Sequence, residues 1–287
     1  VRLLGVWMTR AERERSGLLF VLLALAAMVL VVGRAARDAL FLMHFPVTWI
    51  APMWIAYAAV SSVISIAFAR ALGRWSRSRF AVGFGVGAAA SYVVVRVLFA
   101  RDVLAAYAFF YVWSEVIANL IAVLAWTIAQ DYHDARSAKR LFGIIGAGRV
   151  VGIVVSGFAT GALVRWIGTA NMLVLLAVAL AAFGGITRFL SSRHPLPIRA
   201  GASAERAIEE SDASPAPLWR SRYVVTLSAS TLILFMVLTI ADWQFKAITR
   251  STYPHVDDLA QFMGLFYGTV GLLGLVVQFA VTPNVLA

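Results

Sequence analysis

Long apolar runs separated by short polar segments dominate this 287-residue chain. Each run approaches or exceeds the roughly 20 residues that a helix needs to cross a bilayer, and no alternating pattern typical of strands competes with the runs. The pattern therefore predicts an all-α polytopic membrane protein with eight transmembrane helices. The predicted spans are residues 17–43, 47–69, 80–99, 103–129, 143–164, 169–190, 223–248 and 259–281.

Composition supports a membrane location and argues against several other classes of protein. Hydrophobic residues make up 61% of the chain, whereas a soluble domain is typically about half apolar. The net charge of +11 would suggest a nucleic-acid partner in a soluble protein, but here the basic residues gather between apolar runs, so no nucleic acid is expected. The chain has no cysteine and its four histidines lack ligand spacing, so we expect no metal and no cofactor.

The distribution of basic residues predicts the orientation in the membrane. Of the 25 Lys and Arg residues, 17 lie before the first span or in the even-numbered loops, and only three lie in the odd-numbered loops. By the positive-inside rule the N-terminus is cytoplasmic, and we expect a bacterial inner (plasma) membrane. The first run is too long for a signal peptide and lacks a cleavage site, so we interpret it as a retained helix.

A proline-rich segment divides the chain. Residues 191–222 contain four of the eight prolines beside the only acidic cluster, which favours a flexible cytoplasmic linker. Residues 1–190 are then an N-terminal half of six helices. Residues 223–287 are the first two helices of an incomplete C-terminal half.

A weak internal repeat supports this division. Arg37 and Lys246 precede a proline by nine and eight residues, and Tyr57 and Tyr267 follow at similar places in the next span. Such repeats occur in transporters built from two parallel six-helix halves. We therefore expect eight helices of a natural twelve, with the chain stopping short of its natural end.

Three ionisable residues share one face of the first span. Arg34, Arg37 and Asp38 are spaced i, i+3 and i+4. Counted from Gly17, Arg37 lies roughly 30 Å along the helix, near the outer leaflet. Two interpretations remain open, namely snorkelling to the outer headgroups and a position facing the protein interior.

Glu115 lies about 18 Å along the fourth span, close to the middle of the bilayer, where snorkelling cannot bring it to water. One interpretation is structural, either an ion pair with Arg96 or Arg149 or a protonated carboxyl bonded to Asn119. The other is a carboxylate that faces a cavity and orders a cationic site or carries a proton.

Asp242 and Lys246 are one helical turn apart in the seventh span, inside an almost wholly apolar run. A lone charge at the middle of a membrane helix costs roughly 2.5–3.5 kcal/mol, so such residues usually face a protein interior or a water-filled pathway. The same helix face could be offered to a charged ligand. No constellation of histidine and acid recurs across the loops, so an enzyme is not expected.

Four segments together resemble the nucleotide transporter family typified by ATP/ADP translocases, which has the twelve-helix major facilitator fold. They are R-A-A-R-D-A-L at 34–40, F-Y-V-W-S-E at 110–115, A-R-S-A-K-R-L-F-G-I-I-G-A-G at 135–148, and A-D-W-Q-F-K at 241–246 followed by Q-F-M-G at 261–264. Their order and spacing cover most of the chain. The resemblance implies a major-facilitator-like helical bundle.

The resemblance also implies roles for particular positions. The family's basic residue in helix one falls on Arg37, where Lys is usual, and its helix-four Glu falls on Glu115. Its helix-seven acid falls on Asp242, where Glu is usual, and the following Lys on Lys246. Arg and Lys differ in hydrogen-bonding geometry, as Asp and Glu differ in reach, which leaves the identity of the substrate open.

These observations predict an alternating-access transporter for a small anionic solute, either a nucleotide exchanged in the ATP/ADP manner or another phosphorylated metabolite. The expected substrate-binding residues are Arg34, Arg37, Glu115, Asn119, Asp242 and Lys246. The alternative is a non-transporting membrane module that anchors or regulates a cytoplasmic domain, because relatives of the resembled family can be joined to such domains. The expected partners are the solute, the lipid bilayer and a fused or associated regulatory domain.

Overall fold

The computed structural model describes residues 1–287 except 1, 4–5, 8, 134, 196–221 and 281–287. The described residues divide into two units, one made of residues 1–196 and 254–287 and the other of residues 197–253. The helices of the first unit are α1 (Arg10–His44), α2 (Ile50–Arg74), α3 (Arg77–Phe99), α4 (Leu104–Asp131), α5 (Ala135–Ile167), α6 (Met172–Arg193) and α9 (Val256–Ala280). Short elements are β1 (Arg2–Leu3), β2 (Val6–Trp7), η1 (Val47–Trp49) and η2 (Thr169–Asn171).

Eight helices among the described residues are long and apolar enough to cross a membrane, as expected for an integral membrane protein. All eight predicted spans are confirmed as helices, each overlapping its predicted range. Most helices extend a few residues beyond the apolar run, because hydrogen bonding along the backbone continues into flanking polar turns. Residues 196–221 of the predicted linker, 191–222, lie outside the described residues, whereas its first three residues belong to α6. The predicted division into halves stays a prediction.

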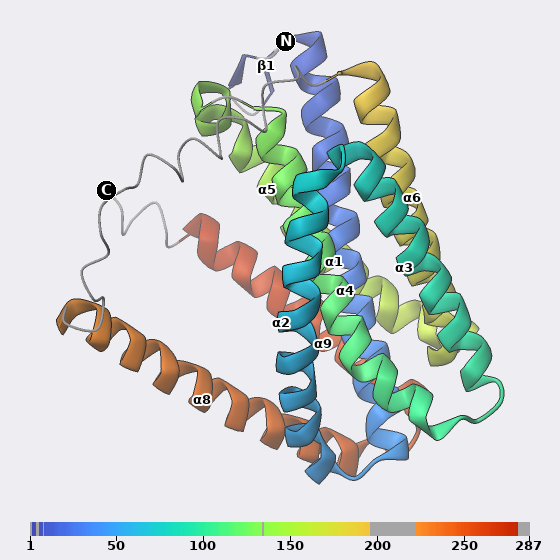
Figure 1. The fold of residues 1–287 in the computed structure, drawn as a ribbon. Helices are drawn as coiled ribbons and strands as arrows, with labels where there is room; N and C mark the ends of the chain where they lie inside the picture. Colours follow the sequence, from blue (N-terminus) through green and yellow to red (C-terminus); the bar gives the residue numbers. More distant parts are fainter. Residues whose placement is uncertain (1, 4–5, 8, 134, 196–221, 281–287) are drawn as a thin grey trace. The chain divides into compact units, whose positions relative to one another are not determined.

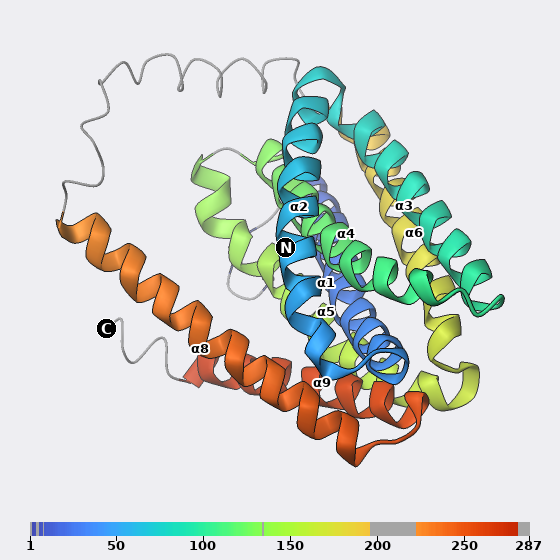
Figure 2. The same ribbon diagram turned by 60° about the horizontal axis from the view of Figure 1, so that its bottom comes forward.

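Helix α1 is the core of the first unit. It packs against α4, α5, α6 and α9, while α3 lies along α6 and α2 along α4 (Figures 1 and 2). Thr9 and Glu12 form a capping box at its start, in which each side chain accepts a hydrogen bond from the other residue's backbone N–H. The helix ends just before Pro46, consistent with the strain that proline imposes on a preceding helical residue.

Glycines allow α5 and α9 to approach closely. A methyl group added at Gly157 would overlap backbone atoms of Gly268, and one at Gly264 would lie 2.9 Å from Thr160. The contacts run antiparallel, since Gly161 lies beside Leu265 while Gly271, further along α9, lies beside Ile153. Close packing of small residues is a common way for membrane helices to associate.

Within the described residues, the second unit contains the helix α8 (Arg222–Thr252), which has 31 residues. Its central turns are apolar, and it is long and apolar enough to cross a membrane. Asp242 and Lys246 are therefore carried by a helix with the composition of a membrane span, as predicted.

We expect Gly157→Ala to destabilise the protein by about 1–3 kcal/mol, because the added methyl group overpacks the α5–α9 contact. Gly143→Ala is the matched control on the same helix, since nothing lies within 4 Å of a methyl group there. That control should be neutral or stabilising by up to about 1 kcal/mol, because glycine costs a helix more conformational entropy than alanine. Thermal unfolding in detergent measures both effects, and equal shifts in the two variants would contradict the close contact.

Candidate functional site

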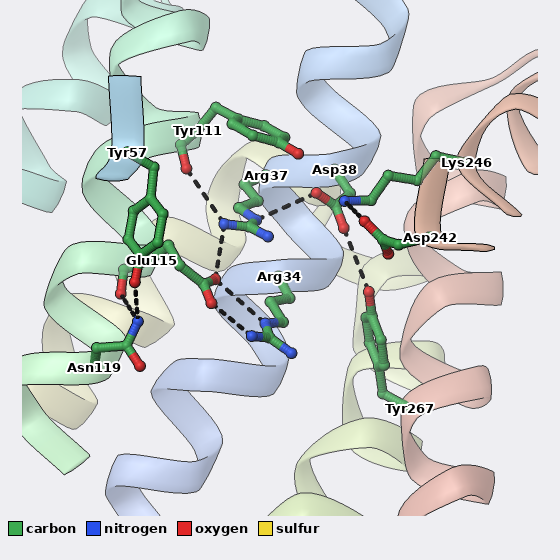
Figure 3. Close-up of polar contacts among 10 residues, drawn as sticks. All are labelled: Arg34, Arg37, Asp38, Tyr57, Tyr111, Glu115, Asn119, Asp242, Lys246 and Tyr267. Atoms are coloured by element: carbon green, nitrogen blue, oxygen red, sulfur yellow. Dashed lines mark hydrogen bonds and ion pairs between the residues drawn. The ribbon is translucent and has the colours of Figure 1, made fainter. Parts of the chain in front are cut away.

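Four ionisable side chains meet between α1 and α4, and we call Arg34, Arg37, Asp38 and Glu115 the charged cluster. Glu115 on α4 accepts from both arginines of α1 (Figure 3). Arg34 holds it side-on, with Nη2 2.5 Å from Oε1 and Nε 3.2 Å from Oε2. Arg37 Nη1 lies 2.7 Å from Oε2 of the same carboxylate. Such charge-assisted pairs are among the stronger hydrogen bonds in proteins.

Arg37 is held on several sides. Its Nε donates to Asp38 Oδ1 at 3.2 Å, and its guanidinium lies over the ring of Tyr111, 4.7 Å from the ring centroid. Only 9% of its side chain is exposed. The side chain therefore points into the helix bundle, and the snorkelling interpretation is wrong.

Arg34 differs from Arg37 in its exposure. Its side chain is 40% exposed and lines a groove of about 420 Å³ between α1, α5 and α9. The carboxylate that it holds is only 11% exposed. Arg34 is thus the most exposed member of the charged cluster and opens onto this groove.

The local sequence explains how α1 and α4 come close enough for these contacts. Gly33 and Ser114 directly precede Arg34 and Glu115, and a methyl group added at Gly33 would lie 2.8 Å from the Ser114 hydroxyl. A larger residue at position 33 would push the helices apart. The helix contact at these two small residues therefore positions the ion pairs.

Two tyrosines connect further helices to the charged cluster. Tyr267 on α9 donates to Asp38 Oδ2 at 3.3 Å. Asn119 donates to the hydroxyl of Tyr57 on α2 at 2.7 Å and to the backbone carbonyl of Glu115 at 3.0 Å. Tyr57 and Tyr267 were not predicted as site residues, although the internal repeat marks both positions.

Four predicted site residues, Arg34, Arg37, Glu115 and Asn119, lie together in the first unit. The other two, Asp242 and Lys246, lie on α8 in the second unit and pair with each other at 2.8 Å. Their spacing of one helical turn gives the predicted shared face. A role for them at the same site stays a prediction.

The partners of Glu115 differ from the structural interpretation made from sequence. It pairs with Arg34 and Arg37, whereas Arg96 donates to Asn171 at 2.8 Å. Counting residues had placed Arg37 nearer the outer surface than Glu115, but their ion pair puts them level. The count failed because α1 has 35 residues, or about 52 Å, and extends well beyond the hydrocarbon core.

Comparisons with protein-family models, curated proteins and solved structures found no match for this chain. The function is therefore inferred from the chemistry of the charged cluster.

Glu115→Gln is expected to lower stability by about 3–5 kcal/mol, because it leaves two guanidinium groups without their shared carboxylate in a mostly buried site. Glu12→Gln is the control and should cost about 0–1 kcal/mol, since Glu12 pairs with a single arginine, the exposed Arg140, whereas Glu115 also pairs with the buried Arg37. Thermal unfolding of both purified variants tests this. Similar losses in the two would mean that the charged cluster does not stabilise the fold.

Proposed function

We propose that this chain forms part of an alternating-access membrane transporter for an anionic solute, a nucleotide or another phosphorylated metabolite. The observation that carries the proposal is the charged cluster. In it, the half-exposed Arg34 and the buried Arg37 both bind the nearly buried carboxylate of Glu115. The resemblance to the nucleotide transporter family agrees with this assignment, and so does the apolar character of the surrounding helices.

A purely structural role explains the charged cluster poorly. Replacing a buried ion pair with well-packed apolar residues is often neutral or stabilising, so buried charges are weak contributors to stability. Ionisable residues inside membrane spans more often mark the path of a solute or ion. The 40% exposure of Arg34 toward the groove gives an anion direct access to a guanidinium group.

The proposed mechanism is competition between the solute and Glu115. A phosphate group accepts hydrogen bonds from a guanidinium in the same side-on geometry as a carboxylate. When it binds Arg34, Glu115 retains Arg37 as its partner at 2.7 Å and stays neutralised. Loss of the Arg34 contact loosens the link between α1 and α4, which couples solute binding to helix movement.

Asp242 and Lys246 fit the same mechanism as a second internal ion pair. Their contact at 2.8 Å is again a base held by an acid, on a different helix. The proposed cycle therefore uses two acid–base pairs from separate parts of the chain.

Neutralising a base of the charged cluster or of the Asp242–Lys246 pair should reduce transport. We expect Arg37→Gln and Lys246→Gln, made in the full-length protein, to reduce uptake of labelled nucleotide into proteoliposomes at least tenfold, since each removes a charge-assisted contact worth about 1.5–3 kcal/mol. Arg165→Gln is the control, because it removes the same charge from an exposed position bonded to Gln261.

Membrane insertion and monodispersity of each variant must match those of the wild type for the comparison to hold. Undiminished uptake by both Arg37→Gln and Lys246→Gln would argue decisively against the proposal. Absence of uptake by the wild-type protein across nucleotides and other phosphorylated solutes would favour the non-transporting module instead.

A further inference from the structure

Five exposed arginines gather where α2 ends, α3 begins and α6 ends, and we call them the arginine edge. They are Arg70, Arg74, Arg79, Arg188 and Arg193. None of them makes an ion pair with a residue that the structure describes, and residues 70–79 and 188–195 contain no Asp or Glu. The arginine edge is thus a concentration of positive charge that the described residues do not neutralise.

Two contacts hold these helix ends together. The hydroxyls of Ser78 at the start of α3 and Ser191 near the end of α6 lie 2.7 Å apart, where the two helices run side by side (Figures 1 and 2). The ring of Phe68 on α2 packs edge-on against that of Phe80 on α3, with centroids 5.0 Å apart. Each residue of the arginine edge is within about one helical turn of one of these four residues, so all five side chains extend from the same end of the bundle.

The arginine edge lies at the boundary of the apolar spans. The helices that carry it are long and apolar enough to cross a membrane, and the arginines lie in their terminal turns. Exposed aromatic residues accompany them, since Trp75 is 63% exposed and Phe189 is 44% exposed. The guanidinium of Arg193 lies over the Phe189 ring, 5.3 Å from its centroid. Arginine beside exposed aromatic rings is typical of the headgroup level of a bilayer, where the ring meets the apolar layer and the charge meets water.

Neighbouring basic residues at the same end of the bundle differ from the arginine edge. Arg77, the other arginine of the α2–α3 connection, binds Asp131 at 2.7 Å. The start of α1 mixes arginines with glutamates, namely Arg10 and Arg13 with Glu12 and Glu14. Positive charge without a nearby carboxylate is therefore a property of the arginine edge that the start of α1 does not share.

An anionic phospholipid headgroup has the chemistry that this surface lacks. Its phosphate oxygens accept side-on hydrogen bonds from guanidinium groups, and its negative charge offsets the repulsion among them. Basic residues beside a membrane span attract anionic lipids, with a gain in affinity of about fivefold for each residue. A zwitterionic headgroup has no net charge and gains little from the same residues.

We propose that the arginine edge is a binding surface for the headgroups of anionic phospholipids. By the predicted orientation, these lipids belong to the cytoplasmic leaflet. The surface is independent of the proposed transport function, because the arginine edge shares no residue with the charged cluster or with the Asp242–Lys246 pair.

The test is native mass spectrometry of the full-length protein in detergent micelles titrated with phosphatidylglycerol or with phosphatidylcholine. The wild type should bind phosphatidylglycerol about a hundredfold more tightly than phosphatidylcholine, or better. The double variant Arg79→Gln, Arg188→Gln removes one exposed guanidinium from α3 and one from α6, and should weaken phosphatidylglycerol binding by about thirtyfold. The variant Arg79→Lys, Arg188→Lys should retain most of the affinity, because it keeps both charges and loses only the planar fork.

The double variant Arg10→Gln, Arg13→Gln is the matched control, since it removes two exposed arginines from the same end of the bundle, where glutamates are interspersed. It should weaken phosphatidylglycerol binding by less than about threefold. An equal loss in the control, or an unchanged preference in Arg79→Gln, Arg188→Gln, overturns the proposal. A last arm adds inorganic phosphate to the wild type. Displacement of phosphatidylglycerol by phosphate at equal concentration would assign the arginine edge to a soluble anion, and the lipid assignment would fail.

Discussion

The cost of burying charge in an apolar helix bundle governs the geometry of this protein. Two guanidinium groups and two carboxylates balance one another between α1 and α4, and each carboxylate lies within 3.2 Å of a guanidinium nitrogen. Removing Glu115 would leave two guanidinium groups without the carboxylate that they share. The close approach of the two helices at Gly33 and Ser114 is the condition that makes this balance possible.

In the proposed mechanism, this internally neutral cluster binds an anion by an exchange of partners. Arg34 must share or give up Glu115, and that contact also joins α1 to α4. On the other side of α1, Tyr267 joins α9 to Asp38. Because both helix contacts depend on the same four charges, occupancy of one guanidinium changes the forces between three helices. An alternating-access cycle requires a ligand that interacts differently with two helix arrangements. A dependence of helix contacts on the occupancy of one guanidinium would meet this requirement.

The sequence predicts the helices, the unusual charges and the pair of Asp242 with Lys246 within one helix, but it leaves the partners of Glu115 on other helices open. The length of each apolar run predicts a span, and the cost of an intramembrane charge singles out Arg37 and Glu115 without any structure. Pairing depends on the rotation and axial position of one helix against another, which periodicity along a single helix does not determine. The structural alternative, in which Glu115 pairs with Arg96 or Arg149, was therefore wrong, whereas a carboxylate that orders a cationic site agrees with its pairs to Arg34 and Arg37. Tyr57 and Tyr267 were missed although the internal repeat marked them.

The two arginines of α1 differ in their contacts and in their exposure, and an arginine at position 37 makes contacts that a lysine could not. A single guanidinium bonds Glu115 and Asp38 and also lies against the Tyr111 ring. An ammonium is a point charge without this planar fork, so it could not reproduce the set. Arg37, whose side chain is 9% exposed, therefore joins the two helices. Arg34, whose side chain is 40% exposed, remains open to the groove.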